Sequence, residues 1–162
     1  MAAPAPIVVR CDDLTGEASR SLIEFHLRGM HEHSPSEAIF ALDLSGLLQP
    51  DVEVWSAWVG EAIAGIGALK KHPGGSNESG RGEIKSMRTH PDFLRCGVAD
   101  AILRTIVERA RLLGLRTLSL ETGSGAAFDP AIRFYHARGF EPGDAFGDYA
   151  KSPFNQFFHR TL

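Results

Sequence analysis

Residues 87–99 have the sequence MRTHPDFLRCGVA, in which a glycine-containing loop precedes a predicted helix. The first amides of a helix are unpaired and together carry about half a positive charge, so a phosphate binds there if the loop lets it approach. Gly97 and Ala99 are small where the backbone would meet such a ligand, and Arg95 adds positive charge. Close packing of a helix on a strand also favours small residues, so this pattern alone is weak evidence.

The segments around this loop predict a strand, a crossover helix and a second strand, at residues 82–89, 98–113 and 117–121. A helical connection between sequential strands makes them parallel. Beyond the second strand, Asp129 is expected to cap a short helix over residues 130–138, which Gly139 terminates. Residues 157–160 are the best candidate for a closing strand.

Upstream, the sequence predicts a strand, a helix and a two-stranded hairpin, at residues 7–10, 17–30, 52–59 and 62–70. Between the helix and the hairpin, Ser34 and Glu37 form a capping-box pattern that predicts a short second helix through Phe40 and Leu42. Residues 73–80 are rich in glycine and serine and predict a mobile loop.

Residues 87–99 resemble the acetyl-CoA-binding motif of the GNAT N-acetyltransferases, in which a Q/R-x-x-G-x-G/A loop follows a strand and a proline-x-aromatic turn. The second signature of that family is a helix ending in aromatic-Tyr-x-x-x-Gly-Phe, and residues 131–140 match it. The resemblance covers residues 52–140, with both motifs in the family's order. One position departs from the pattern, because Leu94 stands at the first Q/R position and the arginine is displaced to Arg95.

The resemblance implies the GNAT fold, an α/β (α+β) architecture with a twisted, mixed, mostly antiparallel central sheet and about four helices. One parallel strand pair would splay apart to form the acetyl-CoA cleft. We expect a single domain over residues 1–162, a length sufficient to bury a core. The expected contacts with coenzyme A come from the motif strand, the loop, the helix start and one aromatic residue: Met87, Arg88, Thr89, Leu94, Arg95, Cys96, Gly97, Val98, Ala99, Asp100 and Phe134.

Acetyl transfer to an amine needs a base for the amine proton, stabilisation of an oxyanion and a proton for the departing thiolate. The resemblance implies that a backbone amide within residues 87–89 polarises the thioester carbonyl and that Tyr135 protonates the sulfur. Glu83 is a candidate base, acting directly or through a water, since some family members carry a glutamate at this distance from the loop. Glu121 is a comparable candidate, because parallel strands direct their carboxyl ends toward the ligand. The alternatives are a core position for Tyr135 and a solvated Glu83.

Strict alternation along the motif strand would divide its side chains between two faces, with Glu83, Lys85, Met87 and Thr89 on one and Ile84, Ser86 and Arg88 on the other.

Other polar residues have simpler explanations. The region of His26, His31 and His33 lines the acceptor site in similar proteins, but these histidines match no metal-ligand spacing and are expected at the surface. Cys96 has no neighbouring base that would make it a nucleophile. Residues 122–125 are expected to form a plain turn. We predict no metal site.

The bulk composition excludes several classes of protein. A formal net charge of −3 argues against nucleic-acid binding. The longest apolar run, residues 62–69, is too short to span a membrane, and residues 1–7 lack the features of a signal peptide. Two cysteines are too few for a disulfide framework, so a cytoplasmic protein is expected.

The expected partner is a small-molecule or peptide amine that accepts the acetyl group, and a strand edge near the C-terminus is compatible with a homodimer. The alternative is a catalytically silent module of the same fold that binds or senses coenzyme A.

Overall fold

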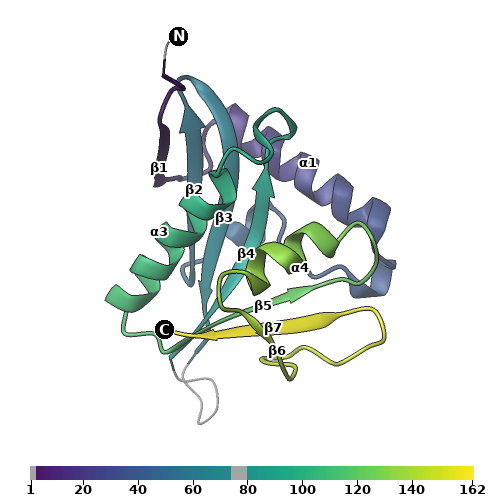
Figure 1. Ribbon diagram of the computed structural model, residues 1–162. Coiled ribbons are helices and arrows are strands. Elements are labelled where there is room, and N and C mark those ends of the chain that lie inside the picture. Colours follow the sequence, from purple (N-terminus) through teal and green to yellow (C-terminus); the bar gives the residue numbers. More distant parts are fainter. Residues whose placement is uncertain (1–2, 74–79) are drawn as a thin grey trace.

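The computed structural model describes residues 3–73 and 80–162, which form a mixed sheet with helices on both faces (Figure 1). Its seven strands lie in the order β1-β2-β3-β4-β5-β7-β6, and of the pairings among them only β4–β5 is parallel. The expected fold class is therefore confirmed. The strands are β1 (Ile7–Cys11), β2 (Val52–Val59), β3 (Ala62–Lys71), β4 (Arg81–Thr89), β5 (Thr117–Thr122), β6 (Glu141–Pro142) and β7 (Gln156–Thr161).

Helices α1 and α3 cover opposite faces of the sheet (Figure 1). The helices are α1 (Glu17–His33), α2 (Leu44–Leu47), α3 (Val98–Leu112) and α4 (Asp129–His136), with single 3₁₀ turns at Ser36–Ala38 and Pro91–Phe93. Ile102 and Ile106 of α3 are buried in one core, whereas Leu22 and Ile23 of α1 are buried in the other. An added Cβ at Gly67 would lie 2.7 Å from Ile102 Cγ2, so this glycine allows α3 to approach β3 closely.

The parallel pair β4–β5 stays together only at its beginning. Residues 81–83 of β4 pair with residues 117–119 of β5. Beyond that point residues 120–122 of β5 pair with β7 alone, while β4 continues along β3. The two strands therefore diverge toward their carboxyl ends, which opens a cleft between them.

A β-bulge bends β4 at the same place. Ala68 of β3 pairs with Lys85 and Ile66 pairs with Arg88, so two residues of β4 oppose the single residue between Ala68 and Ile66. Ser86 in the bulge has a φ of 55°, in the left-handed region that non-glycine residues rarely adopt.

The bulge reverses the alternation of side chains along β4, so the predicted two-face division is wrong beyond Lys85. Met87 packs against the core beneath α3, as Ile84 does, whereas Arg88 reaches His26 on α1. An extra residue in one strand shifts every later side chain to the other face.

Two local predictions are wrong. The expected second helix is only the 3₁₀ turn Ser36–Ala38, after which the chain runs without regular structure until Asp43 caps α2 by accepting a hydrogen bond from the amide of Gly46 (2.9 Å). The carbonyl of Phe40 accepts a hydrogen bond from Lys85 Nζ (2.9 Å). Asp129 does not cap α4, because it is already the first helical residue and Phe128 precedes it without a side-chain cap.

The remaining elements agree with their predicted positions to within a few residues, including the hairpin β2–β3 and the closing strand β7. Most of the expected loop over residues 73–80 lies outside the described residues. None of the helices in the described part of the chain is long and apolar enough to cross a membrane.

Candidate active site

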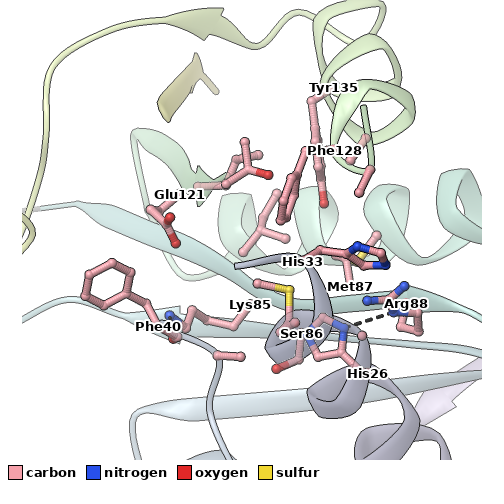
Figure 2. A pocket seen from close by; sticks show the side chains of 18 of the residues that line it. His26, His33, Phe40, Lys85, Ser86, Met87, Arg88, Glu121, Phe128 and Tyr135 are labelled. Atoms are coloured by element: carbon pink, nitrogen blue, oxygen red, sulfur yellow. Dashed lines mark hydrogen bonds between the residues drawn. The ribbon is translucent and has the colours of Figure 1, made fainter. Parts of the chain in front are cut away.

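A pocket of about 190 Å³ lies where β4 and β5 separate, between α1 and α4 (Figure 2). β4 forms one side of it, and the ends of β5, α1 and α4 and the segment after α1 form the others. Its lining residues are His26, Gly29, Met30, His33, Phe40, Ala41, Glu83, Ile84, Lys85, Ser86, Met87, Arg88, Leu120, Glu121, Thr122, Ala127, Phe128, Ala131 and Tyr135.

Tyr135 reaches the pocket from α4, with its hydroxyl directed toward β4 (Figure 2). Its ring packs edge-on against Phe134 and Phe140, which leaves the side chain only 7% exposed. Burial raises the pKa of Tyr135, so the phenol keeps its proton at neutral pH. The hydroxyl donates to no described residue and is free to donate into the pocket.

Glu121 extends from β5 at the other end of the pocket from Arg88 (Figure 2). Its carboxylate accepts no hydrogen bond from a described residue. Burial raises the pKa of Glu121 to about 7. The positive charge of Lys85 opposes this rise, and the negative charge of Glu83 adds to it. Glu121 can therefore exchange a proton near neutral pH.

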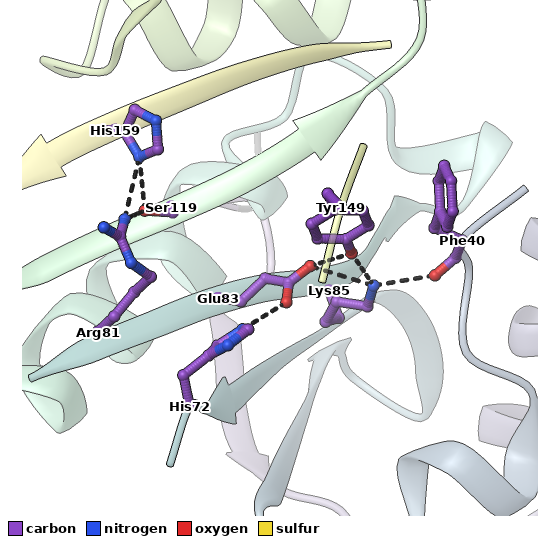
Figure 3. A network of polar contacts seen from close by, with 8 residues as sticks. All are labelled: Phe40, His72, Arg81, Glu83, Lys85, Ser119, Tyr149 and His159. Atoms are coloured by element: carbon purple, nitrogen blue, oxygen red, sulfur yellow. Dashed lines mark hydrogen bonds and ion pairs between the residues drawn. The ribbon is translucent and has the colours of Figure 1, made fainter. Parts of the chain in front are cut away.

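Glu83 lines the pocket as well, but it belongs to a network of polar contacts in the pocket wall (Figure 3). Its carboxylate contacts His72 Nε2 at 2.7 Å and Lys85 Nζ at 3.1 Å, and it accepts a hydrogen bond from the Tyr149 hydroxyl. Burial alone would raise the pKa of Glu83, which is 2% exposed, but His72, Lys85 and Tyr149 together hold it below its usual value. The carboxylate is thus already occupied by three partners.

His26 and Arg88 form a second buried pair, on the α1 side. Arg88 Nε donates to His26 Nδ1 at 3.0 Å. Burial, reinforced by the charges of Arg88 and Lys85, lowers the pKa of His26 to about 3, so this histidine is neutral. The expectation of a surface position is wrong for His26, which is 6% exposed, whereas His31 and His33 are exposed as expected.

The loop before α3 has the geometry of an anion site. Among the described residues, none of the backbone amides from Leu94 to Asp100 donates a hydrogen bond. Arg95 and Gly97 both have positive φ, at 60° and 85°, which gives the loop its tight turn at the N-terminus of α3. Leu94, at the position where the family pattern has Q or R, is 61% exposed. The residues present therefore fit a diphosphate group.

The sequence pattern of the acetyltransferase (GNAT) family matches residues 17–140, which is more than half of the chain. The protein belongs to this family. It is also 44% identical, over 154 residues, to an uncharacterised N-acetyltransferase of Bacillus subtilis strain 168, YsnE, and the match covers 95% of this chain and 99% of YsnE. The GNAT N-acetyltransferase expected from the two sequence motifs is thus confirmed.

Solved structures of acetyltransferases share the GNAT fold of this chain. A putative acyl-CoA N-acyltransferase of Klebsiella pneumoniae superposes with a TM-score of 0.78 and 25% identity, covering 96% of this chain and 97% of the other. A Bacillus subtilis acetyltransferase in complex with CoA superposes with a TM-score of 0.66 and 17% identity, covering 97% and 99%.

The GNAT motif residues lie in two groups. Met87 and Arg88 line the pocket, where Glu83, Glu121 and Tyr135 also meet. The loop residues 94–99 lie outside the pocket at the start of α3.

Asp100, Phe134 and Cys96 were also named from the sequence. The first two contact other side chains, and Cys96 is exposed. The Asp100 carboxylate pairs with Arg138 (2.7 Å) and Arg104 (3.1 Å), so only its backbone amide is available to a ligand. The guanidinium of Arg138 also covers the ring of Phe134 at 3.9 Å. Cys96 is exposed, and its only hydrogen bond within the described chain is to the carbonyl of Leu94.

Sequence reasoning missed the partners of Glu83 and Lys85. Tyr149 and Phe40 belong to segments without a motif, and the hydrogen bonds of Lys85 to them span 64 and 45 residues. The only signal available was the presence of charged residues on a strand that is otherwise buried, since buried charges require partners.

Proposed function

We propose that this GNAT protein transfers an acetyl group from acetyl-CoA to the primary amine of a small molecule or peptide. One observation carries the proposal. The pocket where β4 and β5 separate holds the protonated phenol of Tyr135 and the Glu121 carboxylate, which has no hydrogen-bonding partner among the described residues. Acetyl-CoA would supply an activated thioester, and its diphosphate matches the free amides of residues 94–100.

The two side chains divide the proton transfers of the reaction. As the N–C bond forms, the amine loses a proton, and Glu121 accepts it because its pKa lies close to neutral pH. As the C–S bond breaks, the sulfur gains a proton, which the Tyr135 hydroxyl donates. Backbone amides near the Ser86 bulge are the candidate donors for the oxygen that becomes negative.

Glu83 is the weaker candidate for the base. A carboxylate with three partners and a lowered pKa holds a proton poorly at neutral pH. We therefore assign Glu83 to the support of Lys85 and of the pocket wall, and Glu121 to proton transfer.

The proposal is tested by thiol release from acetyl-CoA in the presence of a panel of amines. The Tyr135→Phe variant should lower kcat by about 100-fold or more, as expected for loss of a general acid. Arg133→Gln is the matched control, because Arg133 is exposed on the same helix and its side chain contacts no described residue, and it should stay within about threefold of wild type. Equal rates in wild type and Tyr135→Phe would remove the acid assignment.

A catalytically silent module is the competing function. It would bind CoA tightly yet release no thiol with any amine of the panel.

The two free cysteines, both exposed, are compatible with the reducing cytoplasm that we propose as the location.

A further inference from the structure

Arg88 is a charged group in the pocket without a counter-ion. Its two contacts within the described chain are the hydrogen bond to the neutral His26 and a position 5.7 Å from the ring centroid of Phe25. No carboxylate of residues 3–73 or 80–162 pairs with it. A half-buried guanidinium is costly unless an anion accompanies it, and it binds carboxylates with two parallel hydrogen bonds.

Lys85 shows what a compensated cation looks like in the same pocket. Its ammonium contacts the Glu83 carboxylate, the Phe40 carbonyl and the Tyr149 hydroxyl. All three of its donors are thus used within the protein. The difference indicates that the partner of Arg88 arrives with the substrate.

Two more pocket groups lack partners. The hydroxyl of Ser86, next but one to Arg88, is buried without a hydrogen bond, although the residue is 9% exposed and lines the pocket. At the other end of the pocket stands the carboxylate of Glu121, which also has no hydrogen-bonding partner among the described residues (Figure 2). The pocket therefore presents an unpaired cation and an unpaired acid at opposite ends.

The size of the pocket limits the acceptor. Its volume of about 190 Å³ lies below the 300–1,000 Å³ or so that is typical of sites for drug-sized ligands. A small molecule with an amine at one end and an anion at the other fits this arrangement of charge.

We propose that the acetyl acceptor is a small amino acid, whose carboxylate binds Arg88 with the help of Ser86 and whose amine faces Glu121. This inference rests on the proposed amine acetylation and narrows it to one substrate class. Arg88 would then be the residue that determines specificity for the acceptor.

The test compares amino acids with the amines that remain after removal of the carboxylate. Suitable pairs, in which the acid carries its amine and its carboxylate at opposite ends, are β-alanine with ethylamine, γ-aminobutyrate with propylamine, and 5-aminovalerate with butylamine. The wild type should favour the acid member of at least one pair by about tenfold or more in kcat/KM. Arg88→Gln should raise KM for that acid by about 10- to 100-fold and so remove most of the preference for the acid over its paired amine. The KM of Arg88→Lys for the acid should lie between those of wild type and Arg88→Gln, because lysine keeps the charge.

Arg111→Gln is the matched control, because Arg111 is exposed on α3 and makes no side-chain contact with a described residue. It should behave as wild type. Acetylation of amines without preference for the acids would overturn this inference and leave the proposed function standing.

Calorimetry of the same amino acids binding to the CoA-saturated protein gives a readout that does not depend on turnover. Binding that Arg88→Gln weakens supports the carboxylate site even if no amine is acetylated. Failure of every amino acid to bind, or equal binding by wild type and Arg88→Gln, overturns it.

Discussion

Glu121 determines how the activity should vary with pH. As a base it acts only when deprotonated, and its pKa is about 7 because it is buried. In a plot of log kcat/KM against pH, we expect the slope to fall by one unit near pH 7. Glu121→Gln should lower kcat by about 100-fold and abolish this break. Glu61→Gln, at the exposed turn between β2 and β3, should keep it.

The same carboxylate should appear in the stability of the protein. A folded-state pKa of about 7 exceeds the unfolded value of 4.5, so the unfolded chain holds fewer protons between these pH values and stability falls as pH rises through that window. Glu121→Gln should therefore be more stable than wild type above pH 7, by about 1–2 kcal/mol after allowance for solvent screening, and equal to it below pH 4. Urea unfolding at pH 4 and pH 8 measures both; a difference that does not grow with pH would contradict the raised pKa.

The network around Glu83 and Lys85 ties together elements that are distant in sequence. It joins β4 to His72 after β3, to Tyr149 in the segment before β7, and to Phe40 between α1 and α2. Phe40 also packs edge-on against Tyr149. These contacts fix two irregular segments, one of which carries a wall of the pocket.

Replacing one member of the Glu83–Lys85 pair should cost more stability than replacing both. Lys85→Met leaves a buried carboxylate without its cation, and we expect a loss of about 3–5 kcal/mol in the free energy of unfolding. Adding Glu83→Gln removes that charge and should recover about half of the loss. Lys151→Met, at an exposed position, is the control and should change stability by less than about 0.5 kcal/mol.

Urea denaturation of the single and double variants measures the coupling. Additive losses would mean that the two side chains do not stabilise each other.

Elements with a local signal could be predicted from the sequence. The apolar spacing of α3, the glycine turn before it and the extended apolar runs of β2 and β3 lie within single segments, and these elements are present. The short helix predicted after α1 is absent, and the Phe40 carbonyl of that segment bonds Lys85, which follows 45 residues later and lies outside the reach of any local pattern. The bulge at Ser86 could not be predicted either, because strand periodicity carries no signal for one extra residue.

The candidate site divides in the same way. Tyr135 and the loop before α3 carry motifs and could be found from the sequence. The contrast between Glu83 and Glu121 could not, because it depends on which side chains surround each carboxylate after the strands diverge.

The chain as a whole should be stabilised by coenzyme A through the free amides at the start of α3. At a CoA concentration 100 times Kd, binding contributes about 2.7 kcal/mol, which corresponds to a rise in Tm of about 5–11 °C for a domain of this size. Pantetheine, which lacks the diphosphate, should give less than half of this shift at the same concentration. Thermal denaturation with each ligand measures the two values.

Alanine variants of two glycines with positive φ, Gly97 and Gly114, distinguish weaker binding of CoA by the loop from a general loss of stability. Gly97 and Gly114 have φ of 85° and 73° and lie at opposite ends of α3, and an alanine at either position costs about 1–2 kcal/mol of strain. Both variants should therefore lower Tm without ligand. Only Gly97→Ala should also reduce the CoA-induced shift, because only this glycine shapes the turn that presents the free amides. An undiminished shift in Gly97→Ala, or equal shifts with CoA and pantetheine, would place the diphosphate elsewhere on the protein.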